Sequence, residues 1–150
     1  MNLYQTLEVE NTRIRKTLGK LLNTTAGQNW ERSDFIEEIR GRLLAQKEVE
    51  ESFIYPLILN MESTWEQARV LYEEQKVILS MVEEMARASK EEPEFQSWIE
   101  RLYTEILSHL EHQEAALFEM ARQAISPEQA EDLGLLAEEK LGRMRSKYLH

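Results

Sequence analysis

Residues 43–57 read LLAQKEVEESFIYPL, and their spacing decides the fold. Five of them follow one another in steps of three and four, which places them on one face of an α-helix. These five are Leu43, Gln46, Glu50, Phe53 and Leu57. The face that should point into the core is therefore apolar at its ends and polar at its middle.

The same periodicity continues along the chain and is interrupted where helix-breaking residues cluster. The breaks divide the chain into helical segments at about 2–23, from Ser33 or Asp34 to near residue 60, 63–89, 94–125 and 127–147. Either Ser33 or Asp34 is expected to be the N-cap of the second segment, and Pro56 to kink or end it. Residues 126–129, Ser-Pro-Glu-Gln, have the form of a capping box that opens the fifth segment.

The fold class predicted from these segments is all-α. Four long amphipathic helices joined by short loops pack best as an up-down-up-down four-helix bundle. We expect a single domain over residues 1–150, with a core bundle at about 2–125. A short fifth helix at about 127–147 should lie across an end or a flank.

Each of the four long segments places polar residues in register with its apolar face. They are Asn11, Gln46, Glu50, Gln75, His109 and Gln113. All six lie near the middle of their segments, and antiparallel neighbours of similar length bring their midpoints to one level. Because an unpaired polar group in a core costs about 1 to 3 kcal/mol, the six should meet in one layer. That layer would be either a ligand site or a closed polar network.

The order and spacing of these residues resemble the hemerythrin-like, or HHE cation-binding, family. In that family the pattern His, His-x-x-x-Glu, His, His-x-x-x-Glu on four helices holds a non-haem di-iron centre. Tyr55 and Pro56 stand where the family often has an aromatic residue followed by Pro; Phe118 matches the second such aromatic, although Glu119 replaces the Pro. The resemblance covers about residues 2–122 and implies a hemerythrin-like bundle.

Four of the six positions differ from the family's ligands. Asn11, Gln46 and Gln75 stand where the resemblance places His, and Gln113 stands where it places the final Glu. Glu50 and His109 keep a ligand type. These six are vestigial di-iron positions, since a neutral carboxamide is a weak donor to such metals and supplies no charge compensation.

We therefore expect no metal and no other cofactor, and a network in which Glu50 and His109 can pair as acceptor and donor. Two alternatives stay open: a weak or altered metal site, with non-haem iron as the implied cofactor, and a pocket filled by water or a small molecule. Glu50 and His109 are the one inward titratable pair that the sequence offers, so we expect no enzymatic activity.

The amino-acid composition limits the classes of partner and the location that we expect. Eighteen Lys and Arg against 28 Asp and Glu give a formal net charge of −10, which disfavours nucleic acid. The chain has no Cys, so it offers no disulfide and no thiolate ligand. Its N-terminus is not a signal peptide, and no apolar run is long enough for a membrane span, so we expect a cytoplasmic protein.

Two functions follow as hypotheses. The first is a bundle without its di-iron centre that acts as a scaffold, interaction module or regulatory remnant. The second is a working family member with an altered ligand shell that binds iron and, as the resemblance would imply, oxygen or nitric oxide. The sequence leaves the protein partner unknown and allows a monomer or a homodimer.

Overall fold

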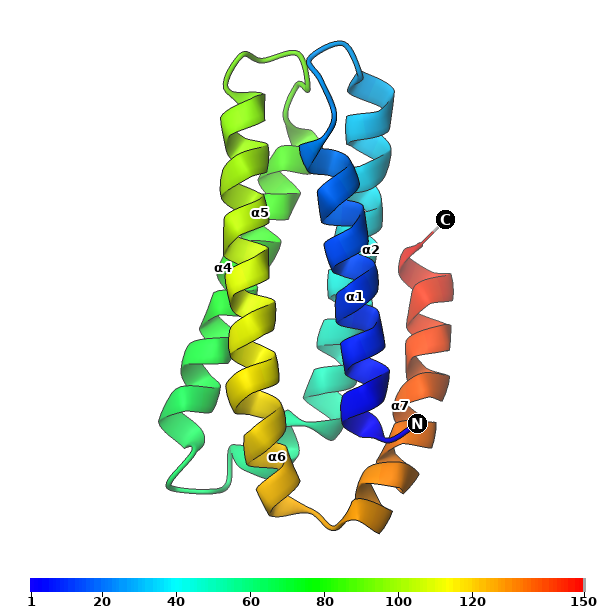
Figure 1. The fold of residues 1–150 in the computed structure, drawn as a ribbon, viewed down its shortest axis with the longest axis vertical. Coiled ribbons are helices and arrows are strands. Elements are labelled where there is room, and N and C mark those ends of the chain that lie inside the picture. The colour runs from blue at the N-terminus through cyan, green and yellow to red at the C-terminus, as the bar shows by residue number, and fades with distance from the viewer. Residues whose placement is uncertain (150) are drawn as a thin grey trace.

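The computed structural model describes residues 1–149, and over these residues the chain is helical, as predicted (Figure 1). The last residue of the expected domain, His150, lies outside the described residues. The long helices are α1 (Leu3–Leu22), α2 (Asn29–Phe53), α4 (Trp65–Arg87), α5 (Phe95–His112) and α7 (Pro127–Tyr148). The short elements are α3 (Tyr55–Ile58), the π-helical turn η1 (Gln113–Leu117) and α6 (Phe118–Ala124).

Four long helices form the bundle. Contacts join α1 to α2, α2 to α4, α4 to α5 and α5 back to α1, so each helix has two neighbours in a closed ring. Successive helices run in opposite directions along the long axis, which confirms the up-down-up-down prediction (Figure 1). Among residues 1–149, no helix has the length and apolar character needed to cross a membrane.

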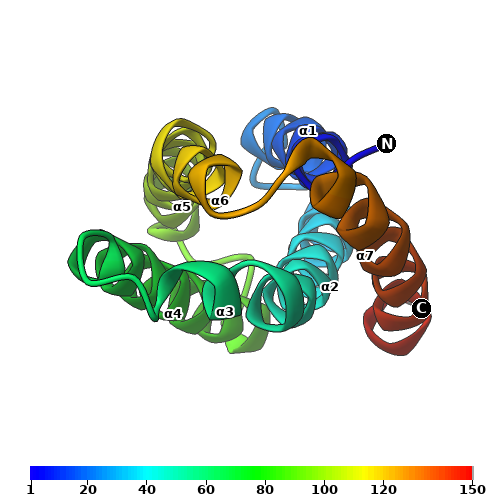
Figure 2. The same ribbon diagram turned by 90° about the horizontal axis from the view of Figure 1, so that it is seen from below.

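The fifth long helix, α7, lies outside the ring against α1 and α2 (Figure 2). It begins with the predicted capping box, in which Ser126 and Gln129 exchange hydrogen bonds. The inner face of α7 approaches the start of the chain closely at Gly134. A Cβ atom added to Gly134 would lie 2.2 Å from the carbonyl oxygen of Met1. Close backbone approach therefore requires glycine at this position.

A buried ion cluster ties α7 to its two neighbours. The side chain of Glu10 on α1 is fully buried and lies 3.0 Å from Arg42 on α2, 3.1 Å from Arg13 and 3.5 Å from Arg145 on α7. A buried carboxylate is tolerated because three guanidinium groups offset its loss of hydration.

The predicted start of the second helix at Ser33 or Asp34 is wrong. Helix α2 begins at Asn29, and its N-cap residue Gln28 makes no side-chain cap bond within the helix. The first turn of α2 is stabilised by a contact with a residue that precedes the helix. Arg32 is buried, and its Nε donates to Thr24 Oγ1 at 2.9 Å. The predicted interruption at Pro56 is confirmed, since α2 ends at Phe53 and Pro56 sits in the first turn of α3.

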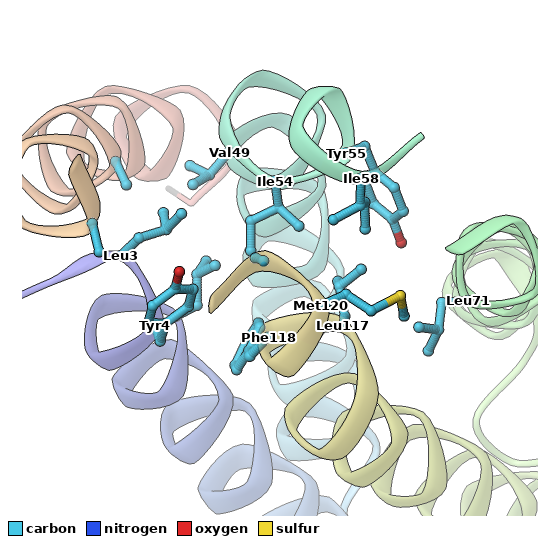
Figure 3. Close-up of a cluster of buried hydrophobic side chains, with 14 of the residues drawn as sticks. Leu3, Tyr4, Val49, Ile54, Tyr55, Ile58, Leu71, Leu117, Phe118 and Met120 are labelled. Atoms are coloured by element: carbon cyan, nitrogen blue, oxygen red, sulfur yellow. The ribbon is translucent and has the colours of Figure 1, made fainter. Parts of the chain in front are cut away.

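The apolar core consists of two clusters at opposite ends of the bundle. The cluster drawn in Figure 3 joins the first turns of α1 to α3, α6 and the end of α2, and includes Leu3, Tyr4, Ile54 and Phe118. The other cluster contains Ile14, Leu43, Ile78 and Ile106, among others. The six polar positions fall along their helices between residues of the two clusters.

Candidate functional site

Five of the six polar positions form one hydrogen-bonded layer across the bundle. Gln113, the first residue of η1, lies at its centre. Its Nε2 donates to both oxygens of Glu50, at 2.7 and 2.8 Å. Its Oε1 accepts from Asn11 Nδ2 and from Gln46 Nε2, each at 3.2 Å. One side chain therefore links α1, α2 and the end of the fourth bundle helix.

Two further bonds complete the layer. Gln46 Nε2 also donates to Asn11 Oδ1, and Gln75 Nε2 on α4 donates to Glu50 Oε1 at 3.1 Å. All five side chains are buried, with Asn11 and Glu50 fully so. We call these five residues the amide layer: Asn11, Gln46, Glu50, Gln75 and Gln113.

Two acceptors of the amide layer lack a donor. The side-chain oxygens of Gln46 and Gln75 are buried and make no hydrogen bond within residues 1–149. The hydroxyl of Tyr55, also buried, has no partner there either. A buried acceptor without a donor is costly, so a further proton in the layer would be favourable.

Glu50 is the one titratable group of the amide layer. Burial raises the pKa of Glu50 to about 8, because the charged carboxylate loses its hydration; the hydrogen bonds from Gln113 and Gln75 act in the opposite direction. The buried Tyr55 hydroxyl also has a raised pKa, first because of burial and then because of Glu50. Burial therefore favours the uncharged form of the carboxyl group, whereas the amide N–H groups favour the carboxylate.

His109 does not join the amide layer. It is buried as expected, but its Nδ1 lies 2.9 Å from Glu74 Oε1 on α4, so the expected pairing with Glu50 is wrong. Glu50 already accepts from two amides, whereas Glu74 is partly exposed and lies beside both histidines. His112 Nδ1 lies 3.2 Å from the other oxygen of Glu74. Burial lowers the pKa of His109, and the hydrogen bond with Glu74 opposes that shift.

The fourth bundle helix is not the continuous α-helix that the spacing predicts. It changes to a π-helical turn at Gln113–Leu117 before continuing as α6. The wider turn rotates the following residues, so Leu117, Phe118 and Ala121 are buried while Ala116 is only partly buried. Gln113 therefore stands at the point where the helix changes its register.

The donor set of the amide layer does not fit a di-iron centre. Glu50 is its one carboxylate, and both of its oxygens face amide N–H groups. Two irons need bridging carboxylates and imidazoles to balance their charge, and carboxamides do not supply it. In the part of the chain that the structure describes, no three His, Asp or Glu side chains converge in an arrangement suited to a metal ion.

Comparison with known proteins identifies the fold. A family model, the Hemerythrin HHE cation binding domain, matches residues 2–121. A crystal structure of a Hemerythrin HHE cation binding domain-containing protein from Mycobacterium kansasii superposes with a TM-score of 0.86, covering 98% of this chain and 89% of that one at 17% identity. At that identity the likeness concerns the fold.

A curated relative is much longer. A protein of Nostoc sp. named DNA nickase is 24% identical over 131 residues, which are 87% of this chain and 36% of that protein. The chain therefore spans little more than a third of that relative's length.

Proposed function

Because this chain belongs to the hemerythrin HHE cation-binding domain family, we propose that its metal layer has become a proton-holding amide layer and that the domain acts as a non-enzymatic interaction module. The observation that carries the proposal is the contact of the Gln113 amide with both oxygens of Glu50. In that place a hydrogen-bond donor, not a cation, meets the carboxyl group.

The chemistry of the layer supports a structural role. Amides donate and accept at once, so five side chains from four helices can satisfy most of one another's polar groups. With a proton on Glu50, the layer needs no external charge. Buried polar groups of this kind can fix the register of helices.

We also propose that the domain is not an enzyme and that it does not bind nucleic acid. His109 and Glu50 are each bonded elsewhere, which separates the one inward titratable pair. The relative named DNA nickase is matched over 36% of its length, so its named activity need not belong to the matched part. A net charge of −10 repels the phosphates of a DNA backbone. We propose a cytoplasmic location.

The decisive experiment is metal content. We would purify the protein without chelator, incubate it anaerobically with ferrous iron, expose it to air, and measure metals by mass spectrometry with a visible spectrum. The expected result is iron well below one atom per chain and no visible band. Two irons per chain with visible absorption would overturn the proposal.

A revertant serves as the matched control. The variant Asn11→His, Gln46→His, Gln75→His and Gln113→Glu restores the ligand types of the family pattern at four positions, and should take up iron under the same conditions. If the revertant folds and binds none, the assignment of these positions to the family's ligands is wrong.

The alternative is a working metal-binding member with an altered ligand shell. Its support is the pair of buried amide oxygens, on Gln46 and Gln75, that make no hydrogen bond within residues 1–149. Together with Glu50 they form an oxygen-rich set, of the type that hard cations accept. One tightly held ion per chain in the metal measurement would establish this alternative.

A further inference from the structure

One flank of the bundle is covered and the other is open. Helix α7 lies over α1 and α2, while α4 and α5 are on the far side (Figure 2). Two hollows follow one another between α4 and α5: Val70 and Val77 line the first, and Met81 and Trp98 line the second. We call this surface, from 70 to 87 on α4 and from 98 to 109 on α5, the α4–α5 groove.

The walls of the α4–α5 groove are apolar and exposed. Val70 is 44% exposed, Val77 56% and Trp98 36%. The buried side chains of Ile78 and Met85 also line the hollows. Aligned exposed apolar side chains above an apolar floor are typical of a surface that another element covers.

The rim of the groove is acidic. Glu73, Glu74, Glu84 and Glu105 line the hollows, against Arg69 and Arg101. Arg69 is already paired with Glu66 on its own helix. Glu73 is paired with Lys76, while Glu84, Glu105 and Arg101 make no ion pair within residues 1–149. Four glutamates against two arginines still give the rim a net negative charge beside an apolar stripe.

The dimensions suit one helix. The groove runs over 18 residues of α4, about 27 Å, since an α-helix rises about 1.5 Å per residue. On the opposite flank α7, of 22 residues, already shows that a helix can lie along two helices of this bundle.

We propose that the α4–α5 groove docks a cationic amphipathic helix of another protein. Apolar residues on one face of that helix would cover Val70, Val77 and Trp98, and flanking Lys or Arg would meet the glutamates of the rim. The inference names the partner surface for the interaction role proposed above and rests on it.

Charge selects this occupant over two others. A second copy carries the same net charge of −10 and would bring its own acidic surface to this rim. An anionic lipid surface would likewise be repelled by Glu73, Glu84 and Glu105.

The test uses a defined probe: an 18-residue peptide of Leu and Lys with the leucines on one helical face. We expect 1:1 binding by calorimetry that weakens as salt is raised. Val70→Ser with Val77→Ser should weaken binding at least about tenfold, because two exposed apolar contacts are lost without a change in charge. Glu84→Gln with Glu105→Gln should weaken it and flatten the salt dependence.

Matched controls separate the groove from general attraction to an acidic protein. Leu135→Ser removes an exposed apolar residue of α7 and should leave the affinity unchanged. A peptide of the same composition, scrambled so that it has no apolar face, should bind at least about tenfold more weakly. Equal weakening by the groove and α7 variants, or equal binding of the two peptides, would overturn the proposal.

Other outcomes are equally decisive. Self-association that the Val70→Ser and Val77→Ser variant abolishes would assign the groove to a second copy, and binding to anionic vesicles through it would assign it to a membrane; both overturn the proposal. If the peptide does not bind and the protein takes up no iron, the docking proposal is wrong and the proposal for the amide layer is unaffected. Uptake of two irons per chain would instead contradict the proposed function, whether or not the peptide binds.

Discussion

The side-chain nitrogen of Gln113 lies 2.7 and 2.8 Å from the two carboxylate oxygens of Glu50, and both residues are buried. This contact spans the bundle from α2 to η1. It also satisfies a carboxyl group in the core: the two oxygens receive N–H groups from Gln113 and Gln75, while burial raises the pKa of Glu50 to about 8.

Gln113→Ala should lower the free energy of unfolding by roughly 2 to 4 kcal/mol. The substitution removes four hydrogen-bond contacts of the amide layer and leaves space beside Glu50. Urea unfolding would measure the change. Gln123→Ala, at an exposed position on α6, is the control and should stay within about 0.5 kcal/mol of the parent protein. Equal effects of the two substitutions would show that the layer adds no stability.

Glu50 should make the protein less stable as the pH rises. In the unfolded chain the carboxyl has its ordinary pKa of 4.5, whereas burial raises the pKa to about 8 in the fold. Between these values the folded state binds more protons, so the stabilisation present below pH 4.5 is lost as the pH rises through 8. The loss should be on the order of a few kcal/mol.

The variant Glu50→Gln isolates this effect. It removes the titrating group and keeps its shape, so its free energy of unfolding should exceed that of the parent at pH 9 and lose the extra slope. Glu62→Gln, an exposed change of the same charge, should leave the pH profile of the parent intact. Parallel profiles for the parent and Glu50→Gln would contradict the raised pKa.

Glu10→Gln should loosen α7. The carboxylate is fully buried among Arg13, Arg42 and Arg145, and the variant leaves three guanidinium groups without their common partner. We expect a loss of roughly 2 to 4 kcal/mol and faster tryptic cleavage in α7, followed by mass spectrometry. Glu8→Gln removes a carboxylate whose one ion pair within residues 1–149 is with the half-exposed Arg122, and should change neither quantity appreciably.

Two glycines of α7 should respond in opposite directions to alanine. Gly134→Ala should destabilise by roughly 1 to 3 kcal/mol, because its Cβ would lie 2.2 Å from the backbone oxygen of Met1, beside the α1 cap residue Asn2. Gly142→Ala meets no atom within 4 Å and should stabilise by up to about 1 kcal/mol through helix propensity. Thermal unfolding of both variants would measure this; a neutral Gly134→Ala would mean that α7 does not pack so closely.

The fold was predictable where local chemistry decides it. The capping box at Ser126 and the break at Pro56 depend on residues adjacent in sequence, and both stand as predicted. The start of α2 was not predictable, because the contact between Arg32 and Thr24 is tertiary and overrides the cap preference of Ser33 and Asp34.

The inward positions of the amide layer were also readable from spacing, but their partners were not. Periodicity places all six predicted polar positions inward, Gln113 included, and says nothing of which atoms meet. Glu74 was missed because it lies beside the apolar stripe of α4, and only the packing of α5 brings His109 to it. The Tyr55 hydroxyl, which makes no hydrogen bond within residues 1–149, was not predicted as part of the site, since an aromatic ring at that position is expected to pack in the core.

The π turn at Gln113–Leu117 has an evolutionary consequence. Such a turn accommodates one residue more than a regular helix over the same height, and the insertion changes which residues face the core beyond it. Removing one residue there would give a regular α-helix in which Leu117 and Phe118 keep their core-facing positions, whereas a regular helix of unchanged length would turn Ala116 to the core in place of Leu117. Alignment of relatives therefore has to permit a one-residue gap at this point.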